Sequence, residues 1–229
     1  MNILAIDTSS EYLSIALQSE HKRSYILEKI GNKHTEFALD KVAQILEEHA
    51  ITIEDINLIA YNQGPGSFTG LRIGLSLAIG ISLGLDIKLV PIPAFAIFAM
   101  AAKSRFGIAG NILVGLDARL NQLYLAGINV DTWGYFLNPE LIDPDKINYV
   151  ENITLIGNGF NAYIDLLQKP LQQKVLDSTY NFDTHPNALN MIDLALTGIY
   201  KEVEAEHADL LYLRNKIALN LAEQAKNKL

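Results

Sequence analysis

The sequence predicts an α/β fold of two similar sub-domains, and three features carry this prediction. Apolar runs of strand length alternate with longer segments in which apolar residues recur at helical spacing. A glycine-rich joint between a strand and a helix lies at residues 62–74. The strand–turn–strand pattern that begins the chain recurs at residues 111–127. We expect a first sub-domain over residues 1–104 and a second over 105–214, with a helix at 215–229 that can pack back on the first.

Composition limits the classes of function. Of 229 residues, 49% are apolar and 19% are charged, which is typical of a globular protein with a sizeable core. The net charge of −8 and the scattered Lys and Arg argue against a protein that grips nucleic acid by itself. The chain has no cysteine, which excludes disulfides, thiolate catalysis and thiolate zinc sites.

We expect a cytoplasmic protein with no membrane association. The start of the chain, residues 1–7, lacks a basic segment and does not look like a signal peptide. The uncharged run at residues 73–85 falls short of the roughly 20 residues that a membrane span needs.

The first half of the chain begins as an antiparallel meander and continues with alternating helices and strands. Asp7 lies at the first turn of the meander. Ala38, Val42, Ile45 and Leu46 recur on one face of the next helix. The expected elements, in order, are strands at 3–6, 13–17 and 25–30, a helix at 35–50, a strand at 56–61, a helix ending at 85, a strand at 87–90 and a helix at 94–104.

The second half repeats the beginning. When Asp7 is aligned with Asp117, residues 3–7 match residues 113–117, and Leu13 matches Leu123. Each aspartate thus opens the turn of a hairpin. Beyond it we expect loop and short strand at 133–150, a strand at 153–156, a glycine turn, a helix at 161–168, a short strand at 175–176, and helices at 188–203 and 217–228.

The turn from Gly64 to Gly70 has two readings. It is not a P-loop, because no Lys-Ser or Lys-Thr pair follows it, and Thr69 stands where the dinucleotide pattern needs glycine. It is either a tight turn that lets the helix approach the sheet, or a cradle whose exposed amides contact a phosphate.

The two aspartates also have two readings. They can hold a hydrated magnesium ion that faces the phosphates of ATP or ADP, or each can cap its own hairpin turn. We expect that the protein requires no cofactor, and that it binds ATP or ADP with magnesium only if the first reading holds. The residues that would line the nucleotide site are Asp7, Thr8, Ser9, Gly64, Gly66, Asp117, Gly157 and Gly159.

Other catalytic constellations are missing from the sequence. No two of the five histidines are three or four residues apart, so we expect no helical metal pair. No Gly-x-Ser-x-Gly motif nominates a hydrolase nucleophile.

The helix after the glycine turn carries two stripes of small residues at a spacing of four. The first stripe is Gly70, Gly74, Ala78 and Ser82, and the second is Ser76, Gly80 and Gly84. Glycine within a helix costs about 1 kcal/mol relative to alanine, so close packing is the expected compensation. The neighbour can belong to this chain or to another.

Together these motifs resemble the bacterial TsaB (YeaZ) family. The similarity spans almost the whole chain, and the run at residues 64–74 is its most specific part. The motifs are Ile6-Asp7-Thr8-Ser9, residues 64–74, Leu116-Asp117-Ala118-Arg119, Gly157-Asn158-Gly159 and Tyr212-Leu213-Arg214. The resemblance implies an actin-like (ASKHA/RNase H-like) duplication of two sub-domains, with mixed sheets flanked by helices. It also implies a role in making threonylcarbamoyl-adenosine beside the anticodon of tRNA.

The resemblance further implies a partner role without intrinsic catalysis. The related catalytic protein TsaD carries a metal-binding histidine pair, and the corresponding residues 90–96 contain no histidine. TsaB pairs with TsaD through its N-terminal helices, here residues 35–50 and 69–85, and the ATPase TsaE joins the pair. We therefore expect tRNA to be reached through the complex, and a homodimer when TsaD is absent. The expected partner-binding residues are Thr69, Leu71, Ile73, Gly74, Leu77, Ala78, Ile81, Val42 and Ile45.

Two functions of other classes stay open beside this one. A Mg-nucleotide-binding ATPase of the actin and sugar-kinase type would explain the acidic hairpins and glycine turns. A metal-dependent peptidase would have to bind zinc or iron, and the sequence offers no recognisable set of metal ligands for it.

Overall fold

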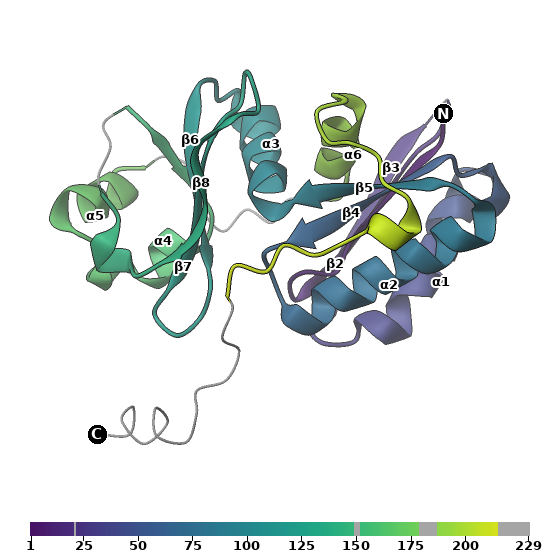
Figure 1. Cartoon of the computed structure of the whole chain (residues 1–229), viewed down its shortest axis with the longest axis horizontal. Coiled ribbons are helices and arrows are strands. Elements are labelled where there is room, and N and C mark those ends of the chain that lie inside the picture. Colours follow the sequence, from purple (N-terminus) through teal and green to yellow (C-terminus); the bar gives the residue numbers. More distant parts are fainter. Residues whose placement is uncertain (21, 149–151, 179–186, 215–229) are drawn as a thin grey trace, which may run out of the picture.

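The computed structural model describes residues 1–20, 22–148, 152–178 and 187–214, which form two lobes, each built on its own β-sheet (Figure 1). The strands are β1 Ile3–Asp7, β2 Tyr12–Gln18, β3 Arg23–Lys29, β4 Leu58–Gly64, β5 Lys88–Pro93, β6 Asn111–Asp117, β7 Leu123–Asn129, β8 Tyr135–Ile142 and β9 Thr154–Ile156. The helices are α1 His34–Glu48, α2 Phe68–Leu85, α3 Ala94–Phe106, α4 Gly159–Ala162, α5 Lys169–Leu176 and α6 Leu189–Leu196.

The four strands of the second sheet repeat the arrangement of β3, β2, β1 and β4 in the first. The first has the strand order β3-β2-β1-β4-β5, in which β1 to β3 are antiparallel and β1, β4 and β5 are parallel. The second has the order β8-β7-β6-β9 with the same directions: antiparallel hairpins, then a parallel pair of β6 and β9. Each sheet is thus mixed, and the predicted actin-like duplication is confirmed.

Alternation of side chains along the strands makes the first lobe three layers thick. Leu4 and Ile6 are buried toward α1 and α2, whereas Ile3 and Ala5 are buried toward α3 and α6. Helix α3 also contacts β6, β7 and β9 of the second sheet, so it lies between the sheets and joins their cores (Figure 1).

Several expected elements of the second half are wrong. The short strand expected within 133–150 is β8, which has eight residues, but the helix expected at 161–168 is replaced by α4 and a 3₁₀ turn, Ile164–Leu166. The short strand expected at 175–176 is the end of α5, because Pro170 is compatible with the first turn of a helix that starts there. Helix α6 ends well before residue 203, since Gly198 has a φ of 71°, outside helical geometry. The expected helix at 217–228 lies outside the described residues.

The chain returns to the first sheet at its end. Helix α6 packs against β1 to β5, and Val203 forms an antiparallel bridge with Leu89 of β5. Further on, the Leu211 amide donates to the carbonyl of Gln63, 2.8 Å away. In Figure 1 this yellow-green segment leaves α6, crosses β5 and runs past α2. The last quarter of the expected second sub-domain, from residue 187, therefore packs on the first sheet.

Helix α2 is longer than the uncharged run suggested. It has 18 residues and is long and apolar enough, by length and composition only, to cross a membrane. It packs on the sheet through Leu71, Ala78 and Ser82 and carries Arg72, so we treat it as a helix of this fold.

Candidate functional site

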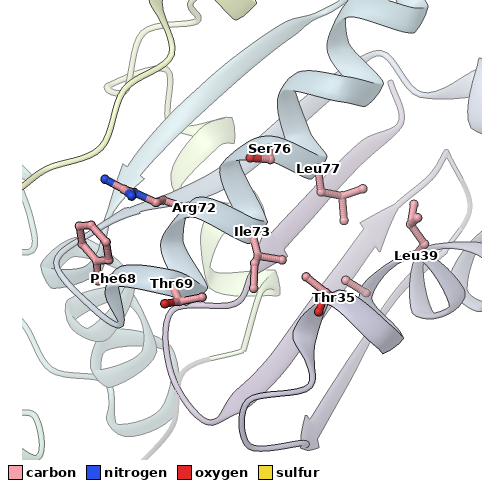
Figure 2. A pocket seen from close by; sticks show the side chains of 9 residues that line it. Thr35, Leu39, Phe68, Thr69, Arg72, Ile73, Ser76 and Leu77 are labelled. Carbon is pink, nitrogen blue, oxygen red and sulfur yellow. The ribbon is translucent and has the colours of Figure 1, made fainter.

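An open apolar groove of about 470 Å³ lies between α1 and α2, and Figure 2 shows the side chains that line it. They are Thr35, Ala38, Leu39, Phe68, Thr69, Arg72, Ile73, Ser76 and Leu77. The lining has one charged side chain, Arg72, at the end near the start of α2. Its chemistry therefore suits an apolar protein surface better than a polar metabolite.

The start of α2 is fixed by its own sequence. The Ser67 hydroxyl accepts a hydrogen bond from the Gly70 amide at 3.3 Å, which satisfies one free donor of the first turn. The buried Thr8 hydroxyl donates to the Gly70 carbonyl at 2.7 Å. A Cβ added to Gly70 would lie 2.0 Å from the Thr8 carbonyl oxygen, and one added to Gly74 would lie 2.5 Å from Thr8 Oγ1. The first small-residue stripe thus brings α2 close to β1 of the same chain.

The second small-residue stripe has no such neighbour. A Cβ added to Gly80 or Gly84 would meet no atom within 4 Å. Only 28% of the helix is buried, and Leu83 is 70% exposed. The outer face of α2 is therefore apolar, rich in small residues and uncovered by the described part of the chain.

The structure places the expected partner-binding residues in two groups. Thr69, Ile73 and Leu77 line the groove, and Ile81 lies half-buried further along α2. The other five are buried in the described structure, and their part in partner binding stays a prediction: Leu71, Gly74, Ala78, Val42 and Ile45.

Sequence reasoning missed groove residues on both helices. Leu39 is 63% exposed, beside the buried stripe that begins at Ala38. A large apolar residue outside the apolar stripe of an amphipathic helix was the available signal. The sequence contains no comparable sign that Phe68 and Arg72 line the groove. The side on which they project depends on the direction in which α2 leaves the preceding turn.

The two aspartate turns are built alike. Asp7 Oδ1 accepts from the Ser9 amide at 2.8 Å, and Asp117 Oδ1 accepts from the Arg119 amide at 2.7 Å. An aspartate that bonds the backbone two residues on is the usual stabiliser of such a turn. Both carboxylates therefore have a structural role without any ligand.

The structure does not bring these aspartates together. Asp7 Oδ2 accepts from Asn62 Nδ2 at 3.1 Å, on the face of the first sheet opposite α1 and α2. Asp117 accepts a 2.6 Å hydrogen bond from the Tyr163 hydroxyl, on the α4 side of the second sheet. Burial, followed by this bond to Asp117, raises the pKa of Tyr163 to about 12.

The other residues of the expected nucleotide site are occupied within the chain. The Ser9 hydroxyl accepts from Asn62 at 2.9 Å, and a Cβ on Gly66 would lie 2.8 Å from Ser9 Cβ. Gly64 and Gly157 both have a φ of 107°, a conformation that requires glycine. A Cβ on Gly159 would lie 2.8 Å from the Leu116 carbonyl carbon. These glycines permit close packing of turns on strands, and nucleotide binding stays a prediction.

The end of the described chain borders α2 at the crevice between the lobes. The Arg72 guanidinium lies 3.8 Å from the Phe68 ring centroid, and its Nε donates to the Tyr212 hydroxyl at 3.1 Å. Arg214 donates to the Ala118 carbonyl at 3.0 Å. A cavity of about 90 Å³ lies beneath these residues, far below the roughly 300 Å³ of a small-molecule site.

Within the described ranges, no three His, Asp or Glu side chains gather in a way that could hold a metal ion. His34 is buried, and its Nε2 lies 3.3 Å from the Tyr12 carbonyl oxygen. The ring nitrogens of His49 lie 2.7 and 2.8 Å from the hydroxyls of Ser24 and Ser19. These two histidines thus have structural partners.

Comparison with known proteins agrees with this architecture. The family model described as TsaD, tRNA N6-adenosine threonylcarbamoyltransferase, matches residues 26–206. The tRNA threonylcarbamoyladenosine biosynthesis protein TsaB of Escherichia coli is 32% identical over 95% of this chain and 96% of that protein. TsaB of Haemophilus influenzae is 28% identical over 95% of each chain.

A solved structure, YeaZ from Pseudomonas aeruginosa, superposes with a TM-score of 0.81 at 25% identity, covering 93% of this chain and 99% of that one. The match extends over both lobes, so the two-sheet arrangement is that of YeaZ. The chain belongs to the TsaB (YeaZ) family of tRNA threonylcarbamoyladenosine biosynthesis proteins, which is related to TsaD.

Proposed function

We propose that this chain is a non-catalytic cytoplasmic subunit that binds and stabilises the catalytic TsaD protein, with the ATPase TsaE joining the pair. The complex places a threonylcarbamoyl group on the tRNA adenosine next to the anticodon. The observation that carries this proposal is the uncovered apolar face of α1 and α2, including the groove between them.

The energetics of that face favour a protein partner. Leu39 and Leu83 expose 63% and 70% of their surface. Burying one leucine side chain contributes about 1.5–3 kcal/mol, so a partner that covered these residues would gain several kcal/mol. Gly80 and Gly84 leave room for the backbone of a partner helix to approach closely.

The non-catalytic assignment is supported by the sequence. Residues 90–96, which correspond to the metal-binding histidine pair of TsaD, contain no histidine and form β5 and the start of α3. The carboxylates of Asp7 and Asp117 are engaged in their own turns.

Co-purification of tagged chain with co-expressed TsaD tests the proposal. Leu39→Glu places a charge in the groove and is expected to reduce recovery of TsaD at least tenfold. Leu176→Glu is the matched control, because Leu176 on α5 is 65% exposed, nearly the same as Leu39. Its recovery of TsaD should equal that of the wild type. Equal recovery by both variants would show that TsaD does not use the groove.

We also propose that the same face forms a homodimer when TsaD is absent. Multi-angle light scattering should then give the mass of a dimer for the wild type and for Leu176→Glu, and of a monomer for Leu39→Glu. A monomeric wild type at micromolar concentration would rule out this self-association.

A further inference from the structure

Three of the five arginines in the chain are connected by hydrogen bonds to the end of its described part, beside the small cavity between the lobes. Arg72 stacks on Phe68 and bonds Tyr212, whose ring centroid is 5.9 Å from that of Phe68. Arg214 and Arg119 meet at the turn after β6, where Arg214 Nη2 lies 3.4 Å from the Arg119 carbonyl oxygen. We call these five residues the arginine–aromatic cluster.

Two charges of this cluster are not neutralised. Arg119 lies 3.5 Å from the Asp117 carboxylate, and Arg23, far from the cluster, pairs with Asp193. Arg72 and Arg214 instead bond a phenol hydroxyl and backbone carbonyls, and no carboxylate of the described residues pairs with either. A guanidinium keeps its charge at any physiological pH. The cluster is thus a local positive site on a chain with a net charge of −8.

Flat aromatic rings beside guanidinium groups suit an unpaired nucleotide of RNA. Bases stack on aromatic rings and on arginine planes, and guanidinium donors bind phosphate oxygens. Phe68 and Tyr212 are 38% and 43% exposed, so ring surface is available. The cavity beneath them, about 90 Å³, is too small to enclose a nucleotide, so a base would stack on the rim.

We propose that the arginine–aromatic cluster contacts unpaired tRNA nucleotides directly. This deepens the proposed function and depends on it for the identity of the RNA, because the sequence alone predicted only indirect contact through the complex. Phe68 and Arg72 also line the groove, so a TsaD molecule seated there would lie next to the cluster. One RNA could then touch both proteins.

The test is fluorescence anisotropy of a labelled anticodon stem–loop RNA, titrated with the isolated chain and with its complex with TsaD. Tyr212→Ala should weaken binding about tenfold in both, because a stacked base is lost. Arg72→Gln should lower the slope of log K against log salt by about 0.7, the value of one phosphate contact on a single strand. Arg105→Gln is the matched control, because Arg105 also stacks on a neighbouring ring, that of Phe106, 5.3 Å away on α3.

Tyr212→Phe separates stacking from loss of structure, since it keeps the ring and removes the hydroxyl. It should bind RNA within about twofold of the wild type. The proposal is overturned if Tyr212→Ala and Arg72→Gln match Arg105→Gln in affinity and slope, or if Tyr212→Phe loses as much affinity as Tyr212→Ala. Tyr212 does not line the groove, so Tyr212→Ala should recover as much TsaD as the wild type does. The proposal would also be overturned if every variant that loses RNA binding loses TsaD binding as well.

Discussion

At the scale of single residues, Thr8 explains why α2 has glycine where it meets the sheet. The threonine is 2% exposed, and its hydroxyl and carbonyl both lie against α2. The Thr8 hydroxyl is therefore used within the core, and the place of Thr8 in a nucleotide site stays a prediction. The glycine-rich motif that identifies the family is, at this contact, a packing device.

This contact predicts opposite effects for two glycine-to-alanine changes in one helix. Gly70→Ala should destabilise the protein by about 1–3 kcal/mol, because the new methyl group would overlap the Thr8 carbonyl. Gly80→Ala should stabilise it by up to about 1 kcal/mol, because the site is open and alanine favours the helix. Urea denaturation measures both. Equal effects of the two changes would contradict the packing described for α2.

The buried Tyr61 predicts a loss of stability in alkaline solution. Its hydroxyl donates to the Asp209 carbonyl at 2.8 Å, and burial raises its pKa to about 12 from 10.0. The folded state thus holds the proton more tightly than the unfolded state. The stabilisation is complete below pH 10 and is lost as the pH rises toward 12, by at most about 1.4 kcal/mol per pH unit.

Denaturation curves between pH 8 and roughly pH 12 test this linkage. Tyr61→Phe should be less stable than the wild type at pH 8, because the Asp209 backbone loses its partner, and the difference should shrink above pH 10. A difference that stayed constant across this range would show that Tyr61 titrates normally in the folded state.

At the scale of elements, the sequence predicted that the small-residue stripes of α2 pack closely against a neighbour in this chain or in another. In the structure one stripe lies on β1 of the same chain and the other is open. The sequence could not say which stripe was which. Both have a spacing of four, and only the direction in which α2 leaves the Gly64 turn, at a φ of 107°, decides between them.

Helix ends in the second half were predicted poorly for a related reason. Residues 161–176 contain short apolar runs that fit a strand or a helix equally well. Tertiary contacts decide: Leu171 and Val175 of α5 are buried against the outer face of the second sheet. Hydrophobic periodicity carries no information about such distant partners.

At the scale of the whole molecule, the duplication was predictable and the path of the chain end was not. Aligning Asp7 with Asp117 found both hairpins. However, Asp7 lies on the face of the first sheet opposite α1 and α2, whereas Asp117 lies on the α4 side of the second sheet. The return of residues 187–214 to the first sheet depends on contacts more than a hundred residues apart, such as Asp209 with Tyr61. No local pattern encodes these contacts, so the sequence could not predict that residues 187–214 pack on the first sheet.

Amide hydrogen exchange, measured by mass spectrometry with and without TsaD, tests the central claim most directly. Binding through the groove predicts slower exchange in peptides covering α1, His34–Glu48, and α2, Phe68–Leu85, with no change in α5. The claim would be contradicted by unchanged exchange of α1 and α2 at saturating TsaD, or by protection confined to the second sheet and its helices.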